Sequence, residues 1–232
     1  MAVSVDTVYQ RVLVLANKEQ RGYITPQEYN LFANQAQMDI FEQYFYDINQ
    51  FSRIPGNDTE YSDMLNYLEE KISLFEDQKT VNKNTTGTFY NISANINDLY
   101  KIGSITHGGY VCEKVNANHI ETINNAPLLK PMSYNPVYTL KDNKVYLYPV
   151  GLEEPITVNY IRRPEKVEWS SYDILGSDTY DLENSVDFEL HQSEETDLVI
   201  KILGLAGVTL KDPALYQIAG AEDNKNIQQE KQ

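Results

Sequence analysis

Few residues in this chain of 232 could carry acid–base, nucleophilic or metal chemistry; among them are three histidines and one cysteine. His107 precedes two glycines and could be a catalytic histidine in a loop, but a Gly-Gly pair favours the tip of a β-hairpin. His119 and His191 have no Asp or Cys near them in the sequence. Cys112 has no second cysteine for an internal disulfide, and no Cys/His spacing typical of a zinc site is present.

Adjacent carboxylates occur at Glu69-Glu70, Glu153-Glu154 and Glu194-Glu195. Neighbouring residues point apart on a helix and to opposite faces of a strand, so these pairs are expected on the solvated surface rather than in an acid–base site. The phosphate-binding glycine motifs, the GxSxG nucleophile motif and the HExxH zinc motif are missing from the sequence. We therefore expect no enzyme, no catalytic residue, no cofactor and no metal ion.

Arg162-Arg163 is a basic doublet that follows a strand candidate. Two arginines are too few for the phosphate contacts of a nucleic-acid site. A salt bridge to another chain or a cap at the strand end is expected instead, so both arginines are candidates for a partner interface.

The net charge is −15, from 19 basic and 34 acidic residues. Residues 1–80 and 181–232 each carry a net charge of −7, while residues 81–180 carry −1. Such a chain should not bind nucleic acid through its own surface, and anionic membranes repel it. The start, MAVSVDTVYQ, lacks the pattern of a signal peptide, and no apolar run could span a membrane, so we expect a soluble protein made in a cytoplasm.

The longest element expected is a helix over residues 25–52, whose start, Thr25-Pro26-Gln27-Glu28, allows the glutamate to reach back to the cap N–H. Apolar residues follow every three or four positions: Ala33, Ala36, Ile40, Tyr44, Ile48 and Phe51. Phe32, Phe41 and Phe45 widen this stripe, and the other side is polar: Gln35, Gln37, Asp39, Glu42, Gln43, Asp47 and Asn49. A helix of about 40 Å with this face needs neighbours along its length, and Phe41 and Phe45 are candidates for a contact between subunits.

Two more helices are expected in the N-terminal part, at residues 3–15 and 59–75. From Thr88 onward, alternation of apolar and polar residues replaces the helical period, which predicts strands. The strand candidates in this stretch are residues 89–94, 99–106 and 110–115, and residues 117–126 are expected to hold one short helix.

The clearest β signal is a hairpin formed by residues 136–140 and 144–148. Asp142-Asn143 at its tip tolerates the left-handed backbone that tight hairpins need. Residues 156–161 are expected to add a third strand to this antiparallel meander, which Arg162-Arg163-Pro164 ends.

Residues 165–187 show no clear period and are expected to form a long excursion before a helix at 193–204, which Gly204 and Gly207 end. Another short helix is expected to start at Asp212-Pro213. The apolar residues of this helix, Leu215, Ile218 and Ala219, are too few for a core of their own. Tyr216 is a candidate anchor on another chain. The polar residues that follow are either part of an assembly arm that docks on another chain or a loose chain end.

Together these patterns predict an α+β protein with an N-terminal helical bundle, a central antiparallel β-meander unit, and C-terminal helices with a tail. The expected segments are a helical unit at 1–78, a β-rich unit at 79–192, and C-terminal helices with an assembly arm at 193–232, all in one compact subunit. The 18 tyrosines suit half-buried sheet and also surfaces that are wet before assembly and buried afterwards.

Three stretches together resemble virion proteins of short-tailed phages, especially crAss-like and related marine phages. They are VYQRVLVLANKEQRGYITPQEYNLFANQAQMDIFEQYF, YNPVYTLKDNKVYLYPVGLEEPITVNYIRRP and FELHQSEETDLVIKILGLAGVTLKDPALYQ, in the same order as in that family. The resemblance implies a ring or adaptor protein of the head-to-tail connector, located in the virion beneath the portal, typically in twelve copies that extend the channel through which DNA leaves.

The partners that the resemblance implies are further copies of the chain, the portal protein, other tail or ring proteins, and double-stranded DNA that passes without specific binding. No membrane is among them. An acidic lumen agrees with this, because it repels phosphate and does not hold the genome back. The alternatives are another tail component, such as a tube or hub protein, and a receptor- or glycan-binding tail module. Because acid–base pairs also form between residues far apart in a chain, an enzyme is a third alternative.

Overall fold

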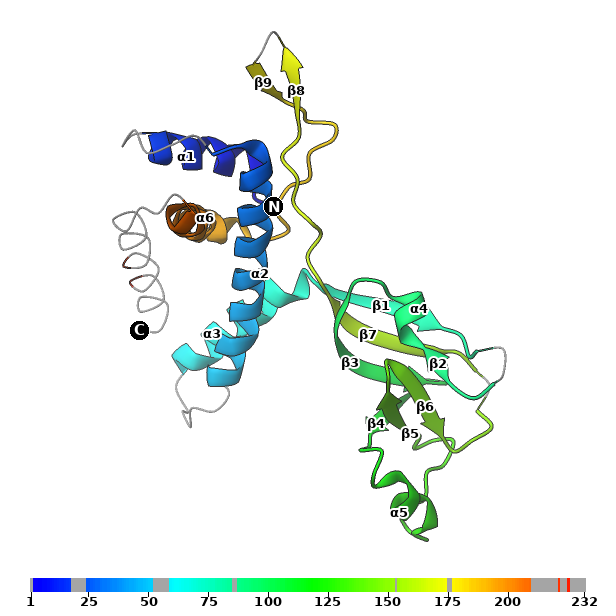
Figure 1. The fold of residues 1–232 in the computed structure, drawn as a ribbon. Coiled ribbons are helices and arrows are strands. Elements are labelled where there is room, and N and C mark those ends of the chain that lie inside the picture. The colour runs from blue at the N-terminus through cyan, green and yellow to red at the C-terminus, as the bar shows by residue number, and fades with distance from the viewer. Residues whose placement is uncertain are drawn as a thin grey trace. The chain divides into compact units, whose positions relative to one another are not determined.

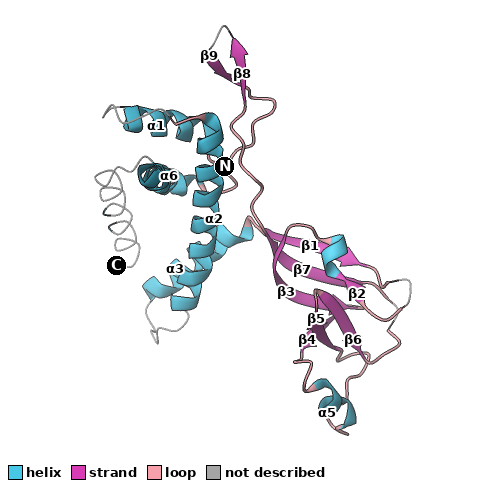
Figure 2. Ribbon diagram, in the orientation of Figure 1, coloured by secondary structure: helices cyan, strands magenta, loops and turns pink. Residues whose placement is uncertain are grey.

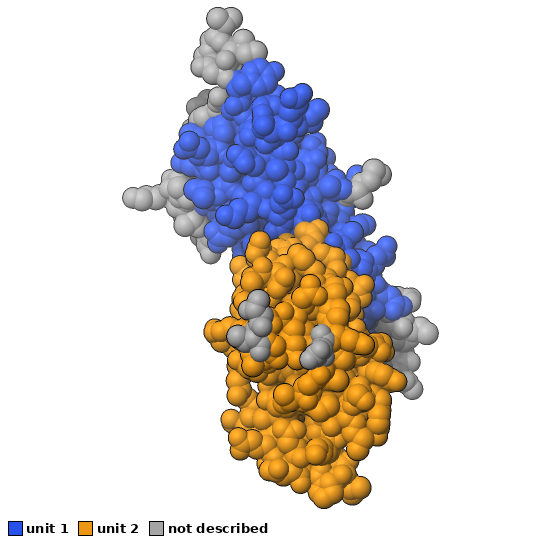
Figure 3. Space-filling model, turned by 90° about the vertical axis from the view of Figure 1, so that its right-hand side faces the viewer, with its two compact units in different colours: residues 1–74, 164–232 blue, residues 75–163 orange. Residues whose placement is uncertain are grey.

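A computed structural model (Figure 1) describes residues 2–17, 24–51, 59–84, 87–152, 154–174 and 177–209, and the single positions 221 and 225. The chain divides into two compact units, which Figure 3 colours separately. Unit 1 combines residues 1–74 with residues 164–232, and unit 2 consists of residues 75–163.

The chain has an α+β fold, as predicted (Figure 2): in the described part of the chain, the four long helices belong to unit 1, and a seven-stranded sheet with two short helices makes up unit 2. The helices are α1 (Val5–Asn17), α2 (Pro26–Phe51), α3 (Thr59–Ser73), α4 (Ile92–Asn95), α5 (Ile120–Asn125), the 3-10 turn η1 (Gln192–Glu194) and α6 (Glu195–Thr209). The strands are β1 (Glu76–Val81), β2 (Tyr90–Asn91), β3 (Leu99–His107), β4 (Tyr110–Lys114), β5 (Val137–Lys141), β6 (Lys144–Tyr148), β7 (Ile156–Arg162), β8 (Ser171–Ile174) and β9 (Ser177–Tyr180).

In unit 1, α2 packs against α3 and α6, and α6 also packs against α1. The expected cap at the start of α2 is confirmed: Glu28 Oε2 accepts hydrogen bonds from the N–H and the hydroxyl of Thr25, at 3.0 and 2.8 Å. The hydroxyl of Thr25 in turn accepts the Glu28 N–H at 3.3 Å. This reciprocal pair satisfies two donors that a helix end would otherwise leave free.

The helix α6 is longer than predicted, because it continues through Gly204 and Gly207 to Thr209. A glycine costs a helix about 1 kcal/mol relative to alanine. Here Leu198, Ile202 and Ala206 are buried on one face of the helix, and the apolar area that they remove from water outweighs that cost. The short helix expected from Asp212 lies outside the described residues.

The polar side of α2 is only partly solvated, because three of its amide side chains bind the backbone of residues 165–169. Asn30 Nδ2 donates to Trp169 O at 3.1 Å, and Asn30 Oδ1 accepts the Trp169 N–H at 2.8 Å. Asn34 makes the same pair of bonds with Val167, at 2.8 and 3.0 Å. We call Asn30, Asn34 and Gln37 the amide ladder.

The third member of the ladder, Gln37, is buried, although its place in the sequence predicted a solvated face. Its Nε2 donates to Glu165 O at 2.7 Å, and its Oε1 accepts the Glu189 N–H at 3.2 Å. The spacing of the ladder along α2 places successive amides near every second residue of an extended segment. Residues 165, 167 and 169 therefore pair with α2, while Glu168 pairs with Val186 on the other side.

Residues 165–187, expected as an excursion without regular structure, contain the hairpin of β8 and β9. At the base of this hairpin, Trp169 stacks on Tyr180 with ring centroids 5.9 Å apart. The Asp181 N–H donates to Ser170 O at 2.9 Å. The segment is therefore joined to unit 1 and not to a β-rich unit ending at residue 192, where the sequence placed it.

Unit 2 is one curled sheet with the strand order β1-β7-β3-β4-β5-β6-β2. Its neighbouring strands are antiparallel except for β4 and β5, which are parallel. Beyond β1, Lys83 pairs with Tyr90 of β2, and the Asn84 N–H donates to Phe89 O at 2.9 Å. The sheet thus curls until its first and last strands meet at one end.

The concave side of the sheet encloses the core of unit 2: Val81, Tyr90, Ile92, Ile96, Ile105, Cys112, Tyr138, Val145, Leu147, Ile156, Val158 and Tyr160. Burial raises the pKa of the Cys112 thiol to about 11. This cysteine is therefore protonated at neutral pH and belongs to the packing of the core.

The predicted hairpin of β5 and β6 is confirmed, with φ values of 49° at Asp142 and 55° at Asn143. The strand expected at residues 156–161 is present as β7, but the prediction that it continues the meander after β6 is wrong. β7 lies between β1 and β3 and does not pair with β6. The strand expected at 89–94 is wrong beyond Asn91, because residues 92–95 form α4, whose first turn Asn91 caps by accepting the Ala94 N–H at 3.3 Å.

Asn34→Ala tests the amide ladder. The substitution leaves the N–H and C=O of Val167 without their partner, and a buried polar group that loses its partner costs about 1–3 kcal/mol. We expect the free energy of unfolding to fall by about 2–4 kcal/mol for the two groups, measured by urea denaturation. Gln35→Ala, on an exposed position of the same helix, is the matched control and should change stability by less than about 0.5 kcal/mol. Equal stability of the two variants would contradict the ladder's role.

Candidate functional site

Two of the predicted interface residues, Phe41 and Phe45, form an edge-to-face pair on α2 with ring centroids 5.1 Å apart. Phe41 is fully buried within the chain itself, whereas Phe45 is half-buried. Phe41 therefore contributes to the core of unit 1. A contact of this pair with another subunit stays a prediction.

Arg162 and Arg163 hold the end of β7 in place within unit 2. The Arg162 N–H donates to Phe75 O at 2.9 Å, and its guanidinium carbon lies 5.9 Å from the Phe75 ring centroid. The Arg163 N–H donates to Asp98 O at 2.7 Å. Both hydrogen bonds come from main-chain N–H groups, which any residue could donate, so a strand-end cap by the arginine side chains and a salt bridge to another chain both stay predictions.

The C-terminal candidates, Leu215, Tyr216 and Ile218, lie outside the residues that the structure describes. Their part in an assembly arm stays a prediction from sequence.

Two of the three histidines lie in unit 2. His107 ends β3 and is buried, and the glycines that follow have φ values of 55° and 84°, which confirms the expected hairpin tip. Its Nε2 has no hydrogen-bond partner among the described residues. His119 occupies the N-cap position of α5 without a side-chain cap bond. Within the part of the chain that the structure describes, no hydrogen bond joins either histidine side chain to a carboxylate or a hydroxyl, as a catalytic histidine would need.

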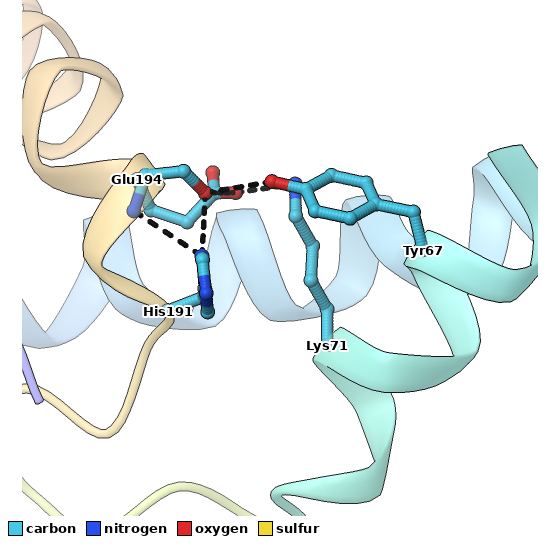
Figure 4. A network of polar contacts seen from close by, with 5 residues as sticks. Tyr67, Lys71, His191 and Glu194 are labelled. Carbon is cyan, nitrogen blue, oxygen red and sulfur yellow. Dashed lines mark hydrogen bonds and ion pairs between the residues drawn. The ribbon is translucent and has the colours of Figure 1, made fainter. Parts of the chain in front are cut away.

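The third histidine, His191, belongs to a network of polar contacts between α3 and the start of α6 (Figure 4). Its Nδ1 accepts the Ser193 N–H at 3.3 Å and so caps the turn η1. The Ser193 hydroxyl lies 2.9 Å from the same nitrogen and 3.2 Å from Glu194 Oε1. From α3, the Tyr67 hydroxyl donates to Ser193 Oγ at 3.0 Å.

The centre of this network is a buried ion pair between Lys71 of α3 and Glu194 of η1. Lys71 Nζ lies 2.5 Å from Glu194 Oε1, and the two residues are 5% and 4% exposed. The ammonium group also lies 4.5 Å from the Tyr67 ring centroid and 5.3 Å from that of Tyr44. Contacts with two aromatic rings and a carboxylate offset part of the cost of removing this charge from water.

A serine beside a histidine is also the arrangement of a nucleophile and its base. Here, however, the histidine nitrogen accepts the backbone N–H of Ser193, and the serine oxygen accepts the tyrosine hydroxyl. Both atoms are thus engaged in closing the turn before α6. The geometry makes this network a joint between α3 and the start of α6.

Sequence reasoning expected Glu194 on the solvated surface as half of an adjacent carboxylate pair, which is wrong because Glu194 is buried against Lys71. It did not name Lys71. The helix-start residues around Glu194 carried the usable local signal. The partner lysine lies on a distant helix, and no local pattern relates the two positions.

Unit 2 has a shallow hollow of about 650 Å³ on the outer face of its sheet. It is lined by Glu76, Asp77, Gln78, Gly103, Ser104, Asn159, Tyr160 and Ile161. Asn159 Nδ2 donates to Ser104 Oγ at 2.8 Å, so two of its polar groups already pair with each other. The ring of Tyr160 is buried in the core, so it is not available to stack on a sugar in the hollow.

The net charges of the two units differ more than those of the three sequence segments 1–80, 81–180 and 181–232. Unit 1 contains ten Lys and Arg against 26 Asp and Glu, whereas unit 2 contains nine against eight. Their net charges are therefore −16 and +1. The acidity of the chain resides in unit 1.

Large apolar side chains are exposed on both units. On unit 1 they include Leu31, Tyr46, Tyr172 and Leu182, and on unit 2 they include Tyr110, Val111, Leu128, Leu129, Met132, Tyr134 and Val150. Scattered exposed apolar residues are ordinary, but a group of them in one short loop marks a contact surface. The loop between α5 and β5 is such a group.

Among the described residues, no three His, Cys, Asp or Glu are grouped closely enough to hold a metal ion. No helix within the described ranges is long and apolar enough to cross a membrane. No protein-family model and no curated protein matches this sequence.

The buried ion pair can be tested by a double-mutant cycle. Lys71→Met leaves an unpaired buried carboxylate and Glu194→Leu leaves an unpaired buried ammonium, so each should cost about 3–5 kcal/mol in urea unfolding. The double variant should be more stable than either single variant, because it leaves no unpaired charge. Arg11→Met, which removes the 2.9 Å pair between the exposed Arg11 and the half-buried Glu195, is the comparison and should cost less than either single variant, because one partner of this pair is solvated. Additive losses in the cycle would contradict this account.

Tyr29 provides a test by pH. Its hydroxyl is buried and donates to Val5 O at 3.1 Å, and burial, followed by the charges of Tyr9 and Asp6, raises its pKa well above the ordinary 10. Below pH 10 the Tyr29 hydroxyl is protonated in both the folded and the unfolded chain, and its contribution to stability is fully present. Above pH 10 the hydroxyl ionises in the unfolded chain but stays protonated in the folded chain, so this contribution is lost as the pH rises.

Tyr29→Phe should therefore lose stability less steeply above pH 10, by up to about 1.4 kcal/mol per pH unit. At neutral pH the variant should be about 1 kcal/mol less stable, because the hydrogen bond is gone. Tyr110→Phe, on an exposed position, should follow the unchanged protein. Identical slopes for Tyr29→Phe and the unchanged protein between pH 10 and 11 would contradict the prediction.

Proposed function

We propose that this protein is a structural virion subunit, a ring or adaptor of the phage head-to-tail connector that extends the DNA channel below the portal. The observation that carries the proposal is that the polar side chains described above pair within the chain, whereas large apolar side chains are exposed on both units. That combination suits a protein whose activity is to bind further chains.

The phage assignment itself rests on the resemblance of three stretches of the sequence to virion proteins. The hairpin of β5 and β6 lies in the second stretch, and most of α2, which carries the amide ladder, lies in the first. Twelve copies around a channel, contacts with the portal and with other ring or tail proteins, and passage of DNA without specific binding are parts of the proposal. The charge of −16 on unit 1 supports the last of these, because a strongly acidic body repels phosphate.

A tube or hub protein of the tail would use the same features, and binding to the portal separates it from a connector subunit. A glycan-binding module is less well supported. The hollow on unit 2 offers amides, a hydroxyl and carboxylates, but the aromatic ring in its lining faces the core. Sugar rings are usually held against exposed aromatic faces as well as polar groups.

Sedimentation velocity of the purified protein, alone and mixed with the portal protein of the same phage, tests the proposal. We expect a large complex when both are present, since a ring subunit buries area on the portal. A variant truncated after residue 211 removes the expected assembly arm and should fold with near-normal stability but form no such complex. A second variant keeps full length and changes only two apolar residues of the arm, Leu215→Ser with Ile218→Ser, and should fail in the same way. A full-length protein that stays monomeric with the portal would contradict the function, and a truncated protein that still binds would contradict the arm.

A further inference from the structure

The loop between α5 and β5 is the most apolar exposed stretch of unit 2. Within residues 127–134, Leu128 is 98% exposed, Leu129 67%, Tyr134 60% and Met132 45%. Four large apolar side chains in eight residues form a local patch that water does not favour. We call residues 127–134 the apolar loop.

The apolar loop is held in shape before it meets a partner. Pro127 and Pro131 fix two of its backbone angles. The Met132 N–H donates to Asn135 O at 3.3 Å, and the Asn135 N–H donates to Met132 O at 3.0 Å. A loop that is already ordered loses little conformational entropy on binding, so more of the buried area contributes to affinity.

The apolar loop also stands out by its charge. Lys130 is its one charged residue, and no carboxylate occurs in the sequence between Glu121 and Asp142. Within unit 2, α5, which leads into this loop, lies far from the end of the sheet at which β1 begins and β7 ends (Figure 1). The loop therefore presents an apolar patch around one positive charge at the free end of a nearly neutral unit.

Unit 1 offers the complementary chemistry at the turn that follows β9. Leu182 is 78% exposed and is flanked by Asp181 and Glu183. Asp181 accepts the Asn184 side-chain N–H at 2.6 Å and the Glu183 N–H at 3.0 Å. The bond from Asn184 lowers the pKa of Asp181, so this carboxylate is ionised at neutral pH. An apolar side chain between two carboxylates matches a patch of apolar side chains around a lysine.

We propose that the apolar loop of one copy docks on the Asp181–Glu183 turn of the next copy, so that subunits associate head to tail. The charges favour this pairing over contacts between two copies of unit 1, because two bodies of net charge −16 repel each other. A contact between two different surfaces of the same chain is heterologous, and it forms a closed ring when the rotation per subunit divides the circle. The inference rests on the proposed ring function and names the surfaces that the ring would use.

The experiment uses full-length protein and two interface variants. The loop variant, Leu128→Ser with Leu129→Ser, removes apolar area from one surface, and the turn variant, Leu182→Ser with Glu183→Lys, alters the other. Val150→Ser in unit 2 and Leu31→Ser in unit 1 are matched controls, because both positions are exposed and lie outside the two surfaces. Thermal unfolding checks that every variant is folded before association is measured by sedimentation velocity, with and without portal.

We expect each interface variant to associate at least about a hundredfold more weakly than the unchanged protein, since two buried leucines or a leucine and an ion pair are lost. An equal mixture of the two variants should form dimers and nothing larger, because the mixture restores one intact loop and one intact turn. The controls should associate normally.

Three results would overturn the docking proposal. Unchanged association of either folded interface variant would show that its surface is not used. A mixture that fails to form dimers would show that the loop of one copy does not bind the turn of another. In both cases oligomers of the unchanged protein still support the ring. An unchanged protein that forms no oligomer with or without portal would overturn the ring function together with this inference.

Discussion

The amide ladder of α2 is the interaction on which the arrangement of unit 1 depends. An extended segment that runs beside a helix has backbone groups that no helix backbone can satisfy, since those of the helix bond to one another. Asn30, Asn34 and Gln37 supply both a donor and an acceptor, and they pair with residues 165–169 and with Glu189 as a neighbouring strand would. The same segment positions Trp169, whose ring lies 4.3 Å from that of Tyr9 and whose Nε1 donates to Asp6 at 3.1 Å.

From this ladder the rest of unit 1 follows in order. The segment after the ladder returns to the chain start, where the Phe188 N–H donates to Val3 O at 3.1 Å and Asp187 accepts the Val5 N–H at 2.8 Å. It then reaches η1, where the ion pair of Lys71 and Glu194 fixes the start of α6 on α3. A buried ion pair adds little net stability, but it penalises every arrangement that separates its charges. The apolar face of α6 supplies the stability, and the polar joints determine where that helix lies.

How much of this the sequence predicts depends on how local each cause is. The cap of Thr25 and Glu28 and the tip of Asp142-Asn143 are determined by neighbouring residues, so the start of α2 and the hairpin of β5 and β6 could be predicted. The burial of Gln37 could not, because its partners at residues 165 and 189 are far away in the sequence and an amide on a helix usually faces water. The partners of β7 and the pairing of Lys71 with Glu194 are determined by tertiary contacts for the same reason. The candidate interface residues were chosen as apolar, and burial within one chain and burial between chains give the same sequence pattern.

Unit 2 is an insertion between the two parts of unit 1, and the sheet explains why such an insertion is possible. β1 and β7 are antiparallel neighbours, with Glu76 opposite Ile161 and the Arg162 N–H bonded to Phe75 O. The chain therefore enters and leaves unit 2 at adjacent points, so the unit can have its own core without separating the segments that build unit 1. This separation allows one chain to combine a body of net charge −16 with a nearly neutral one. In the assembly proposed above, this difference in charge would give the contacts a direction, because contact between unlike bodies is less repulsive than contact between two acidic ones.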